Sequence, residues 1–236
     1  MKNLQSCQNR SGKVPYKNTG EWVADQYHNE TENSVSRRGK HFFEKYLKGK
    51  RVIDIGSGYD TITTNSYQYD RVHNEKFDAT FVKEIADESF DVVYASHVLE
   101  HLTVPYLAIR NWWRILKDNG YLIIAVPDRD EYEQKTELPS NQNSDHKFFV
   151  LENREDLPYT INLKLFLESC LNDKVYHMEY IKTCKKKVFD LDEILPQYRL
   201  LLRGKTGKRV CPENQIETVL RKVGIASVIG PSSVKN

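Results

Sequence analysis

The sequence predicts an α/β fold with a doubly wound, mostly parallel sheet. Three short runs rich in β-branched residues, at 51–55, 90–96 and 120–126, have the pattern of buried parallel strands. A helical pattern over Pro105–Lys117 lies between the second run and the third. Strands that alternate with helices are typical of doubly wound sheets, and 236 residues suit one domain of this kind.

The N-terminal residues divide into an arm and a helical segment. Residues 1–20 are polar and have no apolar periodicity, so we predict a flexible arm. From Glu21 to Leu47 the pattern is helical, with a polar linker at Asn29–Ser36 between two helices. The aromatic residues of this segment suit a lid over a sugar or another small ring. We therefore interpret residues 21–49 as a helical lid.

Further elements are expected on both sides of the third strand. Thr103 is placed to cap the helix before it, and Pro105 fits the first turn of that helix. A long polar loop at 129–147 follows the strand, in a position where lids and substrate loops are common. The remaining expected elements are a helix near Leu163–Leu171, a strand at Val175–Ile181, and helices near Leu191–Leu202 and Glu213–Val223.

Composition and the cysteines indicate a class and a compartment. The longest apolar run is far short of the ~20 residues that span a bilayer, and the N-terminus has no apolar signal-peptide core. No two cysteines share a metal-binding spacing, so we predict no structural zinc site and expect a reducing, cytoplasmic setting. These isolated cysteines are Cys7, Cys170, Cys184 and Cys211.

The charge is unevenly distributed along the chain. The segment Lys182–Lys222 has 11 basic and five acidic residues, a net charge of +6, which leaves −4 for the rest of a chain whose total is +2. This asymmetry indicates an anionic partner on one side of the molecule, and a solvated basic face is the alternative interpretation.

Three predicted strand ends carry residues that suit a ligand site. In an open parallel sheet, ligands bind beyond the carboxyl ends of the strands. The ends here are Asp54-Ile55-Gly56-Ser57-Gly58, Ser96-His97 and Pro127-Asp128. Gly56 and Gly58 would let a ligand approach the backbone where a Cβ would block it, and the Asp54 carboxylate could hold an ammonium group.

These motifs, in this order, resemble the class I S-adenosylmethionine-dependent methyltransferases, and the type 11 methyltransferases among them. Asp54–Gly58 resembles their first motif, Asp87–Leu102 the motif of their fourth strand, and Arg114–Leu122 the turn before their fifth strand. The resemblance implies a seven-stranded Rossmann-like sheet and S-adenosylmethionine as cofactor. A nicotinamide oxidoreductase is the less favoured alternative because the third glycine of a dinucleotide fingerprint is missing.

The resemblance also implies cofactor-binding residues. Asp54, Gly56, Ser57 and Gly58 would surround the methionine end, Asp70 would bind the ribose, Asp78 and Ala79 would lie at the adenine, and Ser96 and His97 would lie beside the sulfonium. A surface turn is the alternative for Asp70. Only 37 positions separate Asp54 from Asp91, so the crossover helices there must be short or missing, and we expect a sheet shortened between strands 1 and 4.

Histidines are the candidate catalytic residues. A hydroxyl acceptor needs a base for its proton, and imidazole is the usual one. His101 is one candidate, with a packing or capping role as the alternative. His146, oriented by Asp145, is the other, with an ordinary surface position as the alternative. Asp128 and Asp145 could also bind a divalent ion, but two carboxylates without a clear third ligand are thin evidence, so we assign no metal ligands and leave metal dependence open.

The expected acceptor is small and hydroxylated. Methyltransferases that attack base nitrogens often have an Asn/Asp-Pro-Pro-aromatic motif after the fourth strand, where this chain has Ser96–Leu99. The leading hypothesis is O-methylation of a sugar, glycan or similar acceptor. An RNA methyltransferase using the basic C-terminal face and a catalytically silent binding subunit are the alternatives. We expect residues 21–236 to form one domain, with the cofactor core at 50–128 and acceptor-side elements at 129–236; the oligomeric state stays open.

Overall fold

A six-stranded sheet forms the centre of the protein. The computed structural model describes residues 30–154, 158–185, 189–190, 208–209 and 214–224. In these residues the strand order across the sheet is β2-β1-β3-β4-β10-β7. The strands are β1 (Val52–Ile55), β2 (Tyr67–Tyr69), β3 (Phe90–Ser96), β4 (Leu116–Pro127), β7 (Tyr176–Cys184) and β10 (Gln215–Lys222).

The predicted doubly wound, mostly parallel sheet is confirmed. β10 is antiparallel to both of its neighbours, so the other five strands run in one direction. The described residues give six strands in this sheet, one fewer than the seven expected. From β1 the chain moves to β2 at one edge of the sheet. It then returns to β3 on the other side of β1 and continues to β4 in the opposite direction. The strand order therefore reverses between β1 and β3, which is where doubly wound sheets bind ligands.

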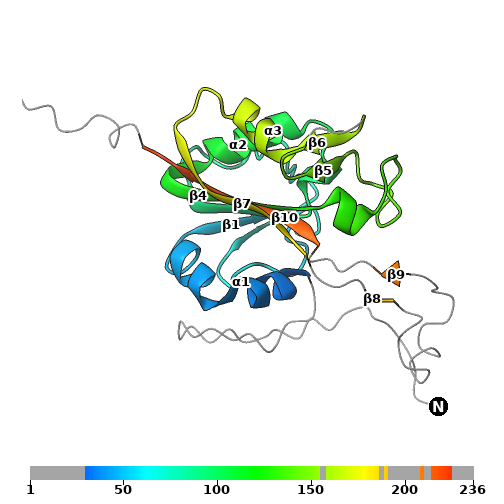
Figure 1. The fold of residues 1–236 in the computed structure, drawn as a ribbon. Helices are drawn as coiled ribbons and strands as arrows, with labels where there is room; N and C mark the ends of the chain where they lie inside the picture. The colour runs from blue at the N-terminus through cyan, green and yellow to red at the C-terminus, as the bar shows by residue number, and fades with distance from the viewer. Residues whose placement is uncertain (1–29, 155–157, 186–188, 191–207, 210–213, 225–236) are drawn as a thin grey trace, which may run out of the picture.

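Helices cover both faces of the sheet, as Figure 1 shows in a view along its edge. α1 (Glu30–Tyr46) lies on one face, and α2 (Pro105–Arg114) and α3 (Leu163–Cys170) lie on the other. The smaller elements are the 3-10 helix η2 (Leu99–His101), the π-helix η3 (Arg129–Glu133), the parallel pair β5 (Phe149–Leu151) and β6 (Thr160–Asn162), and the antiparallel pair β8 (Phe189–Asp190) and β9 (Lys208–Arg209).

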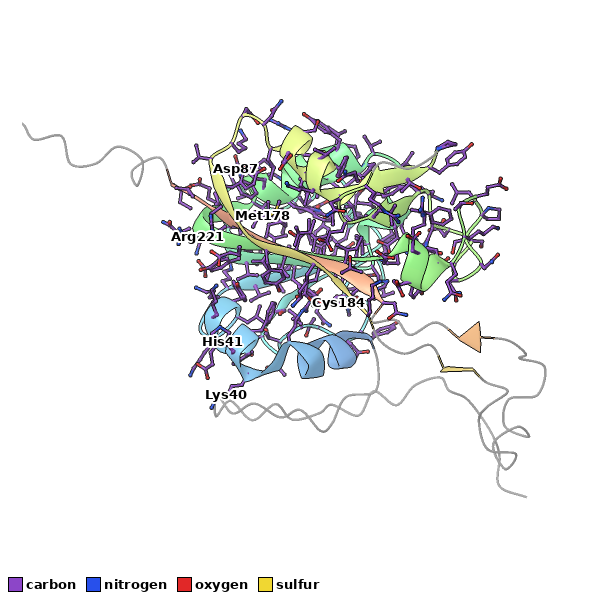
Figure 2. The ribbon with its side chains drawn as sticks, viewed as in Figure 1. Lys40, His41, Asp87, Met178, Cys184 and Arg221 are labelled. Atoms are coloured by element: carbon purple, nitrogen blue, oxygen red, sulfur yellow. The ribbon has the colours of Figure 1, made fainter. Side chains whose placement is uncertain are left out.

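α1 forms a layer of the core. It is helical through most of the expected polar linker and is kinked at Gly39, whose φ is 70°. Phe42 and Tyr46 pack in one cluster with Val52 and Tyr94 of the sheet. Lys40 and His41 are exposed on the same helix, on the sheet face opposite α2 and α3 (Figure 2). Residues 38–47 therefore have their apolar side buried against the sheet, and the lid expected over residues 21–49 stays a prediction.

A buried charge pair fastens α1 to the sheet. The Arg38 guanidinium donates from Nε to Glu217 Oε2 over 2.5 Å and from Nη1 to the Tyr94 hydroxyl over 3.0 Å. The Tyr180 hydroxyl donates to Glu217 Oε1 over 2.5 Å. Buried charges are tolerated when they are paired and hydrogen-bonded in this way. The pair thus requires α1 and β10 to meet at one point.

The expected helix at Glu213–Val223 is wrong, because Gln215–Lys222 is strand β10. Its residues pair with β4 on one side and β7 on the other, and Ile216, Val219 and Leu220 are fully buried. These three apolar positions have helical spacing, but the β-branched Ile216, Thr218 and Val219 suit a strand buried on both faces. The helix expected near Leu191–Leu202 lies outside the described residues.

The expected shortening between strands 1 and 4 is confirmed. No helix occurs at residues 56–66 between β1 and β2, or at residues 70–89 between β2 and β3. α2 supports the second of these loops from the side. The Trp112 indole donates to the Ala79 carbonyl over 2.7 Å, and the Asn111 amide donates to the Thr80 carbonyl over 3.0 Å. These bonds satisfy loop carbonyls that a crossover helix would satisfy internally.

Two local expectations near α2 have different outcomes. Pro105 occupies the first turn of the helix, as expected. The N-cap, however, is Val104 without a side-chain cap, so the capping role of Thr103 is wrong.

The helix expected near Leu163–Leu171 and the strand expected at Val175–Ile181 are found as α3 and β7. No helix in the described part of the chain is both long and apolar enough to cross a membrane.

Arg114, the last residue of α2, provides a test of the support that this helix gives to the loop at residues 70–89. Its guanidinium donates to the Ile85 and Val82 carbonyls over 2.9 and 3.1 Å. We expect Arg114→Met to lower amide-exchange protection in the loop about tenfold or more, since each hydrogen bond contributes about 1 kcal/mol. Arg110→Met is the matched control, because Arg110 bonds to Cys170 and Asp173 outside the loop. Equal protection in the two variants would contradict the prediction.

Candidate active site

A cavity of about 580 Å³ lies at the carboxyl ends of β1 and β3, where the strand order reverses. None of the side chains of α1 that the structure describes, from Arg38 onward, lines it, whereas the loop after β2 and the segment after β3 provide most of its wall. The lining residues are Gly56, Tyr69, Asp70, Arg71, Phe77, Asp78, Ala79, Thr80, Phe81, His97, Val98, His101, Leu102, Thr103, Val104 and Asp145.

Gly56 is the point where the turn after β1 meets the wall of the cavity. Its φ is +71°, and a Cβ built on it would lie 2.2 Å from Cγ2 of Val98. Its amide donates to the Tyr69 carbonyl over 2.9 Å, which ties the turn to the end of β2. Gly58 also has a positive φ, +54°, but open space around its Cβ position. Glycine is therefore required at 56 both for conformation and for space.

Asp54 lies behind this turn and does not line the cavity. Its carboxyl is buried and accepts a hydrogen bond from the Ile62 amide over 2.6 Å. Burial raises the pKa of Asp54 to about 8, because the ionised form loses its hydration. Ser57 and Gly58 also lie outside the lining. The Ser57 hydroxyl donates to the Gly58 carbonyl over 3.3 Å.

Asp70 follows β2 and lines the cavity, as its expected ribose role requires. Its carboxylate accepts from the Gly58 amide at Oδ2 over 3.0 Å and from the Val72 amide at Oδ1 over 2.9 Å. These bonds fix the carboxylate between the first two loops. Each oxygen retains lone pairs, so the carboxylate can still accept from two vicinal hydroxyls.

Asp78 and Ala79 line the same cavity as Asp70. The Asp78 carboxylate accepts from the Thr80 amide over 2.8 Å. Next to it the rings of Tyr69 and Phe77 stack with centroids 4.2 Å apart. The apolar wall beside a carboxylate suits a flat heterocycle with an exocyclic amine.

Ser96 and His97 end β3 in different environments. Ser96 is the last residue of the strand and does not line the cavity, whereas His97 does. His97 has a positive φ of 55°, and its Nε2 donates to Gln215 Oε1 over 2.9 Å. The imidazole is therefore anchored to β10 at the cavity wall.

His101 and Asp145 lie together at the wall of the cavity. His101 Nδ1 donates to Asp145 Oδ2 over 3.1 Å, which leaves Nε2 as the ring's acceptor atom. Burial lowers the pKa of His101, whereas its bond to Asp145 acts in the opposite direction. Lys147 and His101 lower the pKa of the exposed Asp145 carboxyl.

His146 is buried, so the alternative of an ordinary surface position is wrong. It lies behind His101, with ring centroids 4.8 Å apart, and does not line the cavity. Its Nδ1 donates to Glu133 Oε1 over 2.5 Å. Glu133 in turn accepts from the Ser140 hydroxyl.

Glu133 and Glu100, which lie next to the two histidines, had no role predicted from the sequence. Glu133 belongs to the π-helix η3 in the expected polar loop, and Asp128 caps that helix by accepting from the Asp130 and Glu131 amides. Glu100 belongs to η2 and is fully buried. The sequence shows Glu100 beside His101. It does not show that Glu100 is buried, because residues more than 30 positions away, such as His146, cover it.

The geometry agrees with the family match of the sequence. A family model described as a methyltransferase domain matches residues 27–159, more than half of the chain. The chain belongs to the methyltransferase domain family. It is an S-adenosylmethionine-dependent methyltransferase of class I, as the motifs predicted. Among curated proteins, no sequence matches the chain.

Several solved structures resemble this methyltransferase. One is an S-adenosylmethionine-dependent methyltransferase from Archaeoglobus fulgidus, with 19% identity and a TM-score of 0.46, covering 81% of this chain and 94% of that one. Another, from Thermotoga maritima, is described as a possible histamine N-methyltransferase, with 17% identity, a TM-score of 0.44 and coverage of 75% and 84%. A putative methyltransferase from Bacillus halodurans has 14% identity, a TM-score of 0.44 and coverage of 76% and 95%.

Gly56→Ala tests the methyltransferase's cofactor turn. We expect S-adenosylmethionine affinity to fall at least ~10-fold in calorimetry, since overpacking costs about 1–3 kcal/mol. Gly56→Ala combined with Val98→Ala should recover part of the loss, because it removes the clashing methyl group. Gly39→Ala is the matched control: its φ is +70°, and nothing lies within 4 Å of its Cβ position. Unchanged affinity in Gly56→Ala would place the cofactor elsewhere.

Asp54 predicts a pH-dependent stability. Its carboxyl is protonated in the folded protein up to about pH 8, but ionised in the unfolded chain above about pH 4. The unfolded state then binds fewer protons, so the free energy of unfolding falls as pH rises through this window. We expect urea unfolding to show a decline from about pH 5.5 to 7.5 that is smaller in Asp54→Asn, by on the order of 2 kcal/mol. The exposed Asp60→Asn should keep the wild-type slope.

Proposed function

We propose that this methyltransferase transfers the methyl group to a hydroxyl of a sugar, glycan or other small hydroxylated acceptor. The observation that carries the proposal is one cavity that joins Gly56, Asp70 and Asp78 on one side to His101 and Asp145 on the other. The first group suits the cofactor, and the second suits an oxygen whose proton must leave.

The cofactor side has the features that S-adenosylmethionine needs. Gly56 lets the turn at the end of β1 pack against Val98 of the cavity wall, the Asp70 carboxylate suits the ribose hydroxyls, and Asp78 with the Tyr69–Phe77 stack suits adenine. The bound cofactor supplies an electrophilic methyl group on a sulfonium. The protein's task is then to position the acceptor and exclude water.

The two candidate catalytic histidines have different positions. His101 lines the cavity and turns Nε2 away from its partner Asp145, so we assign it to contact with the acceptor hydroxyl. His146 lies behind it and is held by Glu133, which supports a positioning role through the ring of His101.

The cavity lining favours a hydroxylated acceptor over an anionic one. On the acceptor side Asp145 contributes a carboxylate, and among the described lining residues Arg71, next to Asp70, is the one basic residue besides histidines. Carboxylates accept hydrogen bonds from hydroxyls and repel phosphate groups. The cavity of about 580 Å³ has to hold S-adenosylmethionine as well, so the acceptor that shares it is expected to be small.

The RNA alternative has less support. The basic segment has four cations whose side chains the structure describes, Lys182, Lys185, Arg221 and Lys222, and each lies within 4.0 Å of a carboxylate. Cations paired in this way contribute less to phosphate binding. The binding-subunit alternative also has less support, because the Gly56 turn is intact.

A reducing compartment such as the cytoplasm remains part of the proposal. It rests on the isolated spacing of the cysteines. Cys170 is a buried thiol in α3, and burial raises its pKa to about 12. Such a thiol is unreactive and suits a structural position in the core.

A methyl-transfer screen against free sugars, glycans, nucleotide-sugars and RNA tests the proposal. We expect turnover with a hydroxylated acceptor, and a loss of about 100-fold or more in kcat in His101→Ala, since acid–base groups contribute about 10²–10⁴-fold. His146→Ala should lower kcat less. His177→Ala is the control, because His177 is exposed on β7. Transfer to RNA alone, or full activity in His101→Ala, would contradict the proposal.

A further inference from the structure

Three side chains next to the cavity form a group of metal-ligand type. Glu100, His101 and His146 each offer one ligand atom, and these atoms all lie within 4.8 Å of one another. His101 Nε2 and His146 Nε2 are both 3.9 Å from Glu100 Oε1. Two residues come from η2 and the third from the segment before β5, so the fold brings them together across more than 40 positions.

Both imidazoles are oriented by carboxylates on their far sides. His101 donates from Nδ1 to Asp145, and His146 donates from Nδ1 to Glu133. The Nδ1–H tautomer is thereby fixed in each ring, and each Nε2, the acceptor atom of its ring, lies 3.9 Å from Glu100 Oε1. A second carboxylate that fixes the tautomer and the ring direction is a recurring feature of histidines that bind metals.

Neither Nε2 atom is within hydrogen-bond distance of Glu100 Oε1. At 3.9 Å the separations exceed hydrogen-bond length. Ligand atoms about 2.0–2.2 Å from a zinc ion lie about 3–3.5 Å apart, so closing by roughly 0.5–1 Å would complete the set. Glu100 is 0% exposed, and a carboxylate without contact with water is stabilised by a cation beside it.

We propose that Glu100, His101 and His146 bind one divalent transition-metal ion. Two imidazoles and one carboxylate favour zinc, iron, cobalt or manganese over calcium and magnesium, which prefer oxygen ligands. The set has three protein ligands, which is the number that leaves a position open for a substrate.

The open position defines a role in the proposed reaction. His101 lines the cavity, so the ion would lie at its wall and could take the acceptor hydroxyl oxygen as a further ligand. This part rests on the proposed function. It would make His101 a ligand that places the acceptor through the ion, in place of the base expected from the sequence. A bound ion would lower the pKa of the acceptor hydroxyl, so that its proton could pass to solvent water as the methyl group is transferred.

Metal binding can be measured without methyl transfer. The full-length protein is stripped with a chelator and titrated with Zn²⁺, Co²⁺, Mn²⁺ and Mg²⁺ in a calorimeter, without S-adenosylmethionine. We expect one Zn²⁺ or Co²⁺ per chain. Glu100→Gln and His146→Gln should weaken binding more than ~100-fold, and Glu133→Gln about 10–100-fold, as loss of an orienting partner does. His41→Gln is the matched control, since His41 is exposed on α1 (Figure 2).

Two further measurements distinguish the loss of a metal ligand from a loss of folding. His101→Gln changes a partly exposed residue, and it should weaken binding while the melting temperature of the metal-free protein stays near the wild-type value. Visible absorption bands of bound Co²⁺ should change in every ligand variant and not in His41→Gln. No binding by wild type, Mg²⁺ binding alone, or equal affinity in all variants would overturn the metal site.

The role of the ion in the reaction has its own outcome. Methyl transfer by the stripped protein at the full rate would overturn the acceptor-holding role and leave the proposed function intact. Zn²⁺ or Co²⁺ binding without transfer to any hydroxylated acceptor would overturn the proposed function and leave the metal site intact.

Discussion

The short chain between β1 and β3 is the constraint on which the cofactor half of the structure depends. Residues 56–89 must form the turn, strand β2 and the return to β3, which leaves little length for crossover helices, and none occurs there. The loop carbonyls are satisfied from outside by Trp112, Asn111 and Arg114 of α2. The wall that would bind adenine is therefore a loop whose position is set by a helix that follows it in the sequence.

The same constraint brings the two halves of the cavity together. β1 and β3 are adjacent, so the residues that follow them share one edge of the sheet. Gly56 and His97 both have positive φ values, 71° and 55°, and both turns direct the chain away from the sheet at this edge. The cavity thus opens between one turn that packs against Val98 because it lacks a Cβ and another that carries an imidazole.

The sequence allowed prediction of the features that local chemistry determines. The strands at 51–55 and 90–96, the glycine turn and Asp70 after β2 have local signatures, and the structure contains all of them. β10 was predicted as a helix because Ile216, Val219 and Leu220 also have helical spacing, and only pairing with β4 and β7 makes it a strand. The face that α1 covers depends on the buried Arg38–Glu217 pair, whose members are 179 positions apart.

The histidine cluster shows how a buried charge can control an accessible side chain. η2 places Glu100 inside the protein and the next residue, His101, at the cavity wall. His146 and Glu133 complete the cluster from a segment that sequence patterns described only as polar loop. The direction of the His101 ring is thus set by Asp145 on the cavity side and by buried groups behind it. A substitution inside the core can therefore change chemistry at the cavity without altering a residue that lines it.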